Sequence, residues 1–262
     1  MRIALGLEYD GRAFHGWQRQ PEAVSVQGAL EDALSRIAGH SVQVICAGRT
    51  DAGVHACGQV VHFDTDALRP MSAWVRGVNA FLPSAMAVRW SLSVAEDFHA
   101  RYDARARAYR YVLLNRSERP GLWAGRVGWH YLPLDVDAMR AAAGCLLGTH
   151  DFSAFRAAEC QAKNPVRHLI RAEIHRAGKD LVIFDFVANA FLQHMVRNLV
   201  GALVSVGKGV WTIGQMREVL ESCSRALSAP TFAPDGLYFL GPSYLPEWQI
   251  PEARETAGFM AL

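Results

Sequence analysis

One short segment of the chain, GRTDAGVHA at residues 48–56, combines the residue types of a catalytic loop. Asp51 is its only acid, Arg49 lies two residues earlier, and glycines at 48 and 53 let the backbone turn sharply or approach a ligand closely. A neighbouring guanidinium keeps a carboxylate ionised, ready to act as a nucleophile or as an electrostatic partner. The Thr-Asp-Ala-Gly order also fits a surface turn in which Asp51 caps its own backbone.

A cluster of arginines and tyrosines follows further along the chain. Its members are Arg101, Arg105, Arg107 and Arg110, interleaved with Tyr102, Tyr109 and Tyr111. Alternating arginines and aromatic residues favour a nucleic-acid surface, although solvated strand faces carry the same pattern. Cations near Tyr109 would favour its phenolate, a condition for acid–base work by tyrosine. A half-buried structural tyrosine fits the same spacing.

A third candidate, Arg197, lies in the segment FLQHMVRNLVGALVSVG, for which we predict a long helix over 191–206. The helix has an apolar face and a second stripe of polar or small residues, and Arg197 belongs to that stripe. There it would bind an acid from another segment or a phosphate. A solvent-facing arginine is equally compatible with the sequence.

Metal and cofactor signatures are missing from the sequence. His55, Cys57 and His62 have a spacing that matches no common zinc pattern. No phosphate-binding loop, dinucleotide fingerprint or zincin motif occurs. We therefore predict neither a metal nor a cofactor.

The composition indicates a globular chain of 262 residues, 51% hydrophobic and 20% charged, with one large domain or two smaller ones. Only Lys163, Lys179 and Lys208 among the 27 basic residues are lysine; arginine suits phosphate and stacked bases, but a GC-rich genome would also enrich it. Five scattered cysteines without a C-x-x-C pair favour a reduced, cytoplasmic compartment. No apolar run is long enough to span a membrane.

Residue periodicity predicts the elements that position these candidates. In the first part we expect strands over 3–9, 42–46, 60–63 and 88–94, a helix capped by Ser25 and ended by Gly39, and a helix from Pro70 to Pro83. In the second part we expect strands over 108–114, 167–174, 181–187 and 236–240, with helices over 135–147, 191–206 and after Thr212. The tail from Pro246 is expected to be poorly ordered.

This element order predicts an α+β fold built from two ferredoxin-like (RRM-like) halves with antiparallel sheets. Residues 1–104 would form the half that carries the catalytic loop, and residues 105–262 the C-terminal α/β half. The repeated element order, rather than any visible sequence repeat, is the basis for the second half.

The chain resembles the tRNA pseudouridine synthase A family along nearly its whole length. The matching segments are EYDGRAFHGWQRQP, SVQGALEDAL, GRTDAGVHACGQVVHF, RARAYRYVL, GTHDFSAFRA, FLQHMVRNLVGALVSVGKG and APDGLYFLGPSY. The GRTDAGVHA segment is highly specific to that family. Two departures, Gln193 in place of a frequent histidine and the Arg-Ala lead-in to Tyr109, leave the candidate residues unchanged.

The resemblance implies an enzyme that isomerises uridine to pseudouridine at positions 38, 39 and 40 of the tRNA anticodon stem-loop. Asp51 would be the essential carboxylate, and Arg49 would pair with it and hold the target uridine out of the stack. Tyr109 would stack on the uracil, Arg197 would reach Asp51 from the second half, and Leu237 would floor the uracil pocket. The resemblance also implies a cleft between the halves, no cofactor, and a homodimer that recognises tRNA by shape and phosphates.

Two other functions stay open. One is a non-catalytic RNA-binding protein, which the ferredoxin-like order and the arginine–aromatic strips would serve. The other is an aspartate-dependent glycosidic hydrolase, which normally needs a second acid to protonate the leaving group. No second acid accompanies Asp51 in its loop.

Overall fold

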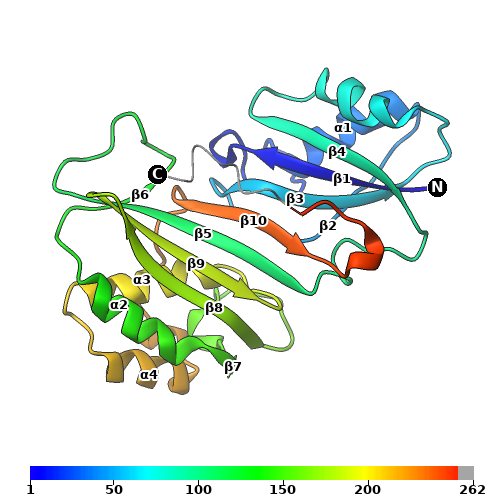
Figure 1. Ribbon diagram of the computed structural model, residues 1–262. Coiled ribbons are helices and arrows are strands. Elements are labelled where there is room, and N and C mark those ends of the chain that lie inside the picture. Colours follow the sequence, from blue (N-terminus) through cyan, green and yellow to red (C-terminus); the bar gives the residue numbers. More distant parts are fainter. Residues whose placement is uncertain (253–262) are drawn as a thin grey trace. The chain divides into compact units, whose positions relative to one another are not determined.

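The computed structural model describes residues 1–252, and contacts within the chain divide it into two compact units (Figure 1). The first unit is Met1–Arg107 together with the segment that starts at Tyr238, and the second is Ala108–Leu237. Each unit contains helices and strands, and the strands pair mostly antiparallel. The predicted α+β class is therefore confirmed.

The first unit follows the predicted order of strands and helices. Its elements are β1 (Arg2–Tyr9), α1 (Val26–Ala38), β2 (Ile45–Cys46), β3 (His55–Asp64), a helix over residues 71–79 whose middle is the π-helix η2 (Ala73–Gly77), β4 (Met86–Val94) and β10 (Leu237–Ser243). Strand β1 pairs with β4 and β3, and β2 pairs with β3, all antiparallel. Strand β10 lies parallel to β3.

Local sequence signals explain the best-predicted helix of this unit. The hydroxyl of Ser25 accepts a hydrogen bond from the Gly28 amide at 3.2 Å, as an N-cap should. Helix α1 ends at Gly39, whose φ of 79° is the left-handed conformation that glycine adopts without strain. Both predicted boundaries are confirmed.

The predicted strand over 42–46 is wrong for its first half. The Val44 amide donates to the Glu31 carboxylate at 3.1 Å, and the Val42 amide donates to the Ser35 hydroxyl at 3.0 Å. Both acceptors lie on α1, so these amides are tied to the helix and only β2 (Ile45–Cys46) joins the sheet. Strand β3, by contrast, extends well beyond the predicted 60–63.

The second unit contains the remaining elements. They are β5 (Ala106–Asn115), β6 (Gly128–His130), α2 (Val136–Ala143), β7 (Gly148–Asp151), β8 (Val166–Ala177), β9 (Leu181–Ala188), α3 (Met195–Gly207) and α4 (Ile213–Ser222). Within this unit the strand order is β5-β9-β8-β7, with β6 paired to β5. Helix α2 packs against β8 and contacts both other helices, which lie together in Figure 1.

Helix α3 starts four residues later than predicted. His194, the residue before it, has a φ of 62° and therefore cannot continue a right-handed helix towards Phe191. The capping box predicted for the next helix is present, with Thr212 and Gln215 each bonding the other's backbone amide. Strands β6 and β7 were not predicted, because three or four residues are too few to show a period.

The prediction of a poorly ordered tail is wrong for its first part. Residues Pro246–Trp248 form a 3-10 turn, and the Trp248 ring lies 5.2 Å from that of Phe98. Ile250 packs against the same buried cluster. The rest of the predicted tail, residues 253–262, lies outside the described residues. Within residues 1–252, no helix has the length and apolarity needed to cross a membrane.

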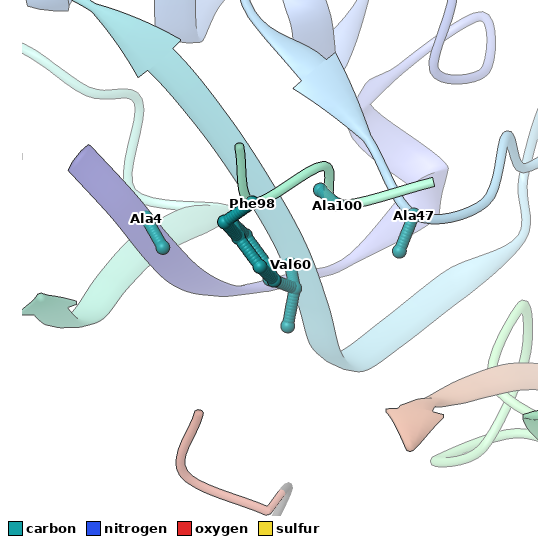
Figure 2. Close-up of a cluster of buried hydrophobic side chains, with 5 residues drawn as sticks. All are labelled: Ala4, Ala47, Val60, Phe98 and Ala100. Carbon is teal, nitrogen blue, oxygen red and sulfur yellow. The ribbon is translucent and has the colours of Figure 1, made fainter. Parts of the chain in front are cut away.

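The core beneath the GRTDAGVHA segment is a cluster of small and aromatic side chains. Figure 2 shows its five buried members, which come from β1, β3, the segment between β2 and β3 and the segment after β4: Ala4, Ala47, Val60, Phe98 and Ala100. Ala47 is the residue directly before Gly48, and its amide donates to the Val60 carbonyl at 2.8 Å. The loop that follows therefore starts from a fixed point in the core.

Candidate active site

The loop that carries Asp51 runs from Gly48 to Val54 and joins β2 to β3. Its first residue is held by Gln59, a fully buried side chain on β3. The Gln59 amide nitrogen donates to the Gly48 carbonyl at 2.5 Å, and its oxygen accepts from the Gly48 amide at 3.4 Å. A single side chain thus holds both backbone groups of the residue before Arg49.

The middle of the loop is held at Thr50. The Tyr9 and Thr50 hydroxyls lie 2.8 Å apart in a buried hydrogen bond, and the Thr50 carbonyl accepts from the Trp17 amide at 2.9 Å. Burial is the largest cause that raises the pKa of Tyr9, so this phenol is neutral at physiological pH. Thr50 is therefore fixed through both its side chain and its backbone, between Arg49 and Asp51.

Two glycines of the DGRAFHGW segment let the chain lie against the loop. A Cβ on Gly11 would sit 2.2 Å from the Val54 carbonyl oxygen, which no side chain tolerates. A Cβ on Gly16 would sit 2.9 Å from the Thr50 carbonyl oxygen, and its φ is +87°. The two contacts are backbone against backbone, so they fix the loop without any charged group.

Asp51 itself opens a tight turn. Its carbonyl accepts from the Val54 amide at 3.2 Å, and Gly53 has a φ of 80° at the third position, the signature of a type II turn. The predicted turn is therefore present, closed by the backbone carbonyl. The Asp51 side chain is half-buried, whereas Arg49 is exposed. The loop thus carries a carboxylate and a guanidinium on a backbone that is held at Gly48, Thr50 and Val54.

His55, at the end of the loop, is a structural residue rather than part of a histidine–cysteine cluster. Its Nδ1 accepts from the Gly11 amide at 3.1 Å, and its ring stacks on Tyr238 with the centroids 4.6 Å apart. His62 Nδ1 accepts from the Ala100 amide at 3.1 Å. Within residues 1–252 there is no group of three or more histidine, cysteine or acidic side chains that could hold a metal ion.

The predicted arginine–aromatic surface divides into structural and exposed members. Arg107 donates to three backbone carbonyls, those of Ala47, Ala104 and Arg101, and Arg110 forms a two-pronged ion pair with the buried Asp185. These two guanidiniums hold the fold together, which corrects their assignment to a nucleic-acid surface. Arg101, Tyr102 and Arg105 are exposed.

In the second unit, Tyr109 is a buried residue of β5. Its ring meets that of Phe191 edge to face, with the centroids 5.0 Å apart. Tyr111, two residues on, is completely buried and donates to the Ala233 carbonyl at 2.9 Å. The strand face that these tyrosines share is therefore mostly apolar, with the arginines of the predicted strip confined to its start.

Arg197 lies in the first turn of α3 and is half-buried. Its Nε donates to the Phe232 carbonyl at 2.8 Å, and the Phe232 amide donates back to the Arg197 carbonyl at 3.3 Å. The alternative of a solvent-facing arginine is therefore wrong. Leu237, the last predicted residue, is buried at the start of β10, with its amide bound to the Pro234 carbonyl at 2.8 Å.

A buried polar network holds the segment 228–232 that binds Arg197. Asn198, completely buried on α3, donates to the Phe155 carbonyl at 2.8 Å and accepts from the Thr231 hydroxyl at 2.7 Å. Arg225 donates to Thr231 and to the carbonyls of Ser228 and Ala229. A Cβ on Gly201 would lie 2.3 Å from the Pro230 carbonyl oxygen, so the segment lies directly on the helix.

The sequence did not identify most of the residues that fix the Asp51 loop and the segment 228–232. Tyr9, Gln59 and Asn198 are polar side chains at buried positions of a strand or helix, which is the signal that could have identified them. Gly11 and Gly16 flank an aromatic pair, but only the fold reveals which backbone they approach. The chemistry available to the loop is that of one positioned carboxylate beside an exposed cation.

Comparison with known proteins places the chain in a family. The model of the family described as tRNA pseudouridine synthase matches residues 7–103 and 142–244. The chain is 59% identical to a protein of Dechloromonas aromatica over 97% of both chains, and 57% identical to one of Chromobacterium violaceum over 98% of both. It is also 57% identical to one of Aromatoleum aromaticum, over 96% of this chain and 95% of that one.

All three relatives are named tRNA pseudouridine synthase A. The family match covers both units, and the identities extend over almost the entire length of each relative. The matched residues include the whole loop with Arg49 and Asp51, together with Arg197 and Leu237. The chain belongs to the tRNA pseudouridine synthase family.

Proposed function

We propose that this chain isomerises uridine to pseudouridine in tRNA, with Asp51 as the essential carboxylate. One observation carries the proposal: a chain that matches a tRNA pseudouridine synthase over 97% of its length holds the only acid of its GRTDAGVHA loop on a turn fixed by Gln59, Tyr9 and Thr50. Such fixed placement of a reacting group is a main source of rate enhancement in enzymes. As in the resemblance described above, the target positions would be 38, 39 and 40 of the anticodon stem-loop.

The reaction breaks the N1–C1′ glycosidic bond, turns the uracil and joins C5 to C1′. The proton on C5 leaves and N1 gains one, so nothing is oxidised and no atom other than hydrogen is exchanged. A single carboxylate is enough for either of two routes. Asp51 attacks C1′ and is later displaced by C5, or it removes a sugar proton to give a glycal that C5 then re-adds to.

Arg49 would act on the target base before the chemistry. A uridine within the stem has to leave its stack, which costs a few kcal/mol. An exposed guanidinium next to the carboxylate can occupy the vacated space and also pair with Asp51. The exposure of Arg49, in contrast to the buried Thr50 beside it, supports this role.

Tyr109, Arg197 and Leu237 would bind the extruded uridine. Tyr109 would stack on the uracil and take the C5 proton, Arg197 would reach the Asp51 carboxylate, and Leu237 would floor the pocket. Their support is local: Tyr109 is kept edge-on to Phe191, and the Arg197 guanidinium is tethered through Nε to the Phe232 carbonyl. The predicted division into residues 1–104 and 105–262, with a cleft between them, belongs to the same proposal.

The ferredoxin-like interpretation of the halves has support from the first unit. The strand order there is β4-β1-β3 with β2 on the far side of β3, which is the order of a split βαβ unit. In the second unit, α2 precedes and α3 follows the hairpin of β8 and β9, with the short strand β7 inserted after α2. We propose that both halves use this plan.

The proposed partner is tRNA, bound by a homodimer in the cytoplasm. Recognition through shape and phosphate contacts makes binding strongly dependent on salt. We expect the affinity for an unmodified tRNA transcript to fall steeply between 50 and 200 mM salt, by about 10³-fold for six or more phosphate contacts. A flat salt response would count against tRNA, and sedimentation at several concentrations tests the dimer.

The direct test uses tRNA labelled with tritium at C5 of its uridines. A synthase releases the tritium to water while the uracil stays attached to the RNA. Free uracil would instead identify a hydrolase, and tRNA binding with no tritium release would identify a non-catalytic RNA-binding protein. Treatment of the product with a carbodiimide reagent and primer extension then maps which position has been converted.

A further inference from the structure

Gln59 is a polar side chain in the middle of a strand, yet it is completely buried. It lies on β3 opposite Leu7 of β1, and its amide bonds both backbone groups of Gly48. Burying an amide costs free energy unless its donors and its acceptor find partners. An apolar side chain would fill the same space without that cost, so packing alone does not account for a glutamine at this position.

The hydrogen bonds of Gln59 act on two successive peptide planes. Because a peptide unit is planar, a hydrogen bond to its carbonyl or its amide restrains the Cα atoms at both of its ends. In the plane that joins Ala47 to Gly48, Arg107 donates to the carbonyl at 3.2 and 3.3 Å and the Gln59 oxygen accepts from the amide. In the next plane, the Gln59 nitrogen donates to the Gly48 carbonyl at 2.5 Å. Gln59 therefore restrains the plane that carries the Cα of Arg49.

Asp51 depends on a different anchor. Its Cα belongs to the plane of the Thr50 carbonyl, which accepts from the Trp17 amide at 2.9 Å. The Thr50 hydroxyl in turn bonds that of Tyr9 at 2.8 Å. Burial raises the pKa of Tyr9, and hydrogen bonds from Thr50 and Gln59 oppose that rise, so the phenol lies between the two anchors. The arginine and the carboxylate of the loop thus have separate supports that one buried hydroxyl joins.

The restraint at Gly48 matters most for the side chain that follows it. Arg49 is exposed, so the direction of its guanidinium depends on the backbone that carries it rather than on packing. The guanidinium lies at the end of a long side chain, and a small tilt of the peptide plane displaces it by more than it displaces the Cα. A displacement near 1 Å of a group that positions the substrate lowers the rate by about 100-fold.

We propose that Gln59 is a positioning residue for Arg49, and that it serves the extrusion of the target uridine rather than the step at the glycosidic bond. The inference rests on the proposed function, in which Arg49 occupies the space that the uridine leaves. Gln59 is completely buried and therefore acts through the loop, without touching the RNA. Extrusion costs least for a mismatched base, so the need for Gln59 should fall when the target uridine has no pairing partner.

The test uses two tRNA transcripts labelled with tritium at C5, each with uridine at one target position. In one the uridine is paired, and in the other the opposite base is replaced so that it cannot pair. Gln59→Leu, in the full chain, should lower single-turnover tritium release from the paired transcript by about 100-fold. From the unpaired transcript the loss should be about 5-fold at most, the effect of one hydrogen bond. The ratio of the two rates is independent of the folded fraction, so partial unfolding of the variant does not change it.

Further variants separate positioning from general damage. Arg49→Ala should show the same dependence on pairing, and adding Gln59→Leu to it should cause no further loss, because one residue acts through the other. Tyr9→Phe leaves the bonds of Gln59 to the loop in place and should lose equally from both transcripts. Thr65→Val removes a buried hydroxyl that accepts from the Ala67 amide at 3.1 Å, outside the loop, and should leave both rates unchanged.

Aminopurine placed beside the target uridine reports extrusion without any chemistry, because its fluorescence rises when the neighbouring base leaves the stack. Gln59→Leu should lose this rise on the paired transcript while its affinity for tRNA stays within a few-fold of the wild type. The inference is overturned if Gln59→Leu loses tritium release equally from both transcripts, or if the unpaired transcript rescues only one of Gln59→Leu and Arg49→Ala. A wild type that gives the fluorescence rise but releases no tritium rejects the proposed reaction alone.

Discussion

The loop that carries Asp51 and the segment that holds Arg197 are both irregular backbone, but they are fixed by different means. Neutral groups hold the loop: the Gln59 amide, the hydroxyls of Tyr9 and Thr50, and direct backbone contact at Gly11. The segment 228–232 is held by the guanidinium of Arg225 together with Asn198, and the hydrogen bonds of Arg225 go to neutral oxygens.

This difference fits the charge that each region has to present. A carboxylate stays available for chemistry when the groups that position its backbone bring no charge of their own. In the second unit, guanidiniums bound to carbonyls keep their positive charge, as an anionic ligand such as RNA requires. The first experiments below each break one of these sets of contacts.

The largest effect is expected where backbone packs on backbone. Gly11→Ala places a Cβ 2.2 Å from the Val54 carbonyl oxygen and would push the loop away, lowering kcat by about 100-fold, as a displacement near 1 Å does. Gly201→Ala meets the Pro230 carbonyl at 2.3 Å and should instead raise KM by moving the support of Arg197. Steady-state tritium release measures both.

Gly121→Ala is the matched control for these two variants, since a Cβ there meets nothing within 4 Å. Equal losses of kcat in Gly11→Ala and Gly201→Ala would show that the two regions do not differ in the way described. Loss of kcat in Gly121→Ala would mean that the assay reports general instability.

The next effect concerns the buried network of the second unit. Asn198→Leu leaves the Phe155 carbonyl without its donor and the Thr231 hydroxyl without its acceptor, which should lower the free energy of unfolding by about 2 kcal/mol. Adding Thr231→Val should cost less than the sum of the two single changes, because two apolar side chains then face each other. Denaturant titration measures the free energy of unfolding of the two single variants and the double variant. A loss in the double variant equal to the sum of the two single losses would contradict the network.

A smaller effect is expected from a single hydroxyl in the first unit. Tyr9→Phe removes the hydrogen bond to Thr50, which should lower stability by about 1 kcal/mol and kcat by about 5-fold. Tyr244→Phe removes a partly buried hydrogen bond of the same kind, to the Ala100 carbonyl at 2.6 Å, and should lower stability only. Thr50→Ser keeps a hydroxyl, so its stability and kcat should stay close to those of the wild type. An equal loss of kcat in Tyr9→Phe and Tyr244→Phe would refute the role of Tyr9.

An effect that is absent at neutral pH is a dependence of stability on pH through His62. Burial lowers the pKa of His62 to about 4, whereas an unfolded histidine titrates near 6.5. The unfolded chain therefore binds the proton first, so the contribution of His62 to stability is complete above pH 6.5 and is lost as the pH falls towards 4. His62→Gln keeps an acceptor for the Ala100 amide and should flatten the profile between pH 4.5 and 6.5; an unchanged slope would contradict this assignment.

Much of this fold could be predicted from the sequence, because its helices and long strands show regular periods and clear caps. Ser25, Gly39 and Thr212 mark helix ends through local backbone chemistry, and the structure has those ends. The segment 42–44 could not be assigned in this way, because its amides bond Glu31 and Ser35 on a helix that the chain has already formed. Such contacts join residues that are distant in the sequence, so the segment itself shows no pattern that predicts them.

The candidate residues show the same limit. The GRTDAGVHA loop could be singled out because its residue types are unusual together, but the side chains that hold it come from β1 and β3. Arg107 and Arg101 each follow an alanine and lie within two residues of a tyrosine, yet one binds three backbone carbonyls and the other is exposed. Only the fold distinguishes a guanidinium that holds the chain together from one that is available to a ligand.

The most direct test of the account is a single-turnover measurement with enzyme in excess over C5-tritiated tRNA, comparing the wild type with Asp51→Asn. The variant keeps the size of the side chain and removes only its charge and nucleophilicity. We expect tritium release to fall by about 10³-fold or more while the affinity for tRNA stays within a few-fold of the wild type. Tritium release by Asp51→Asn at a rate close to that of the wild type would contradict it.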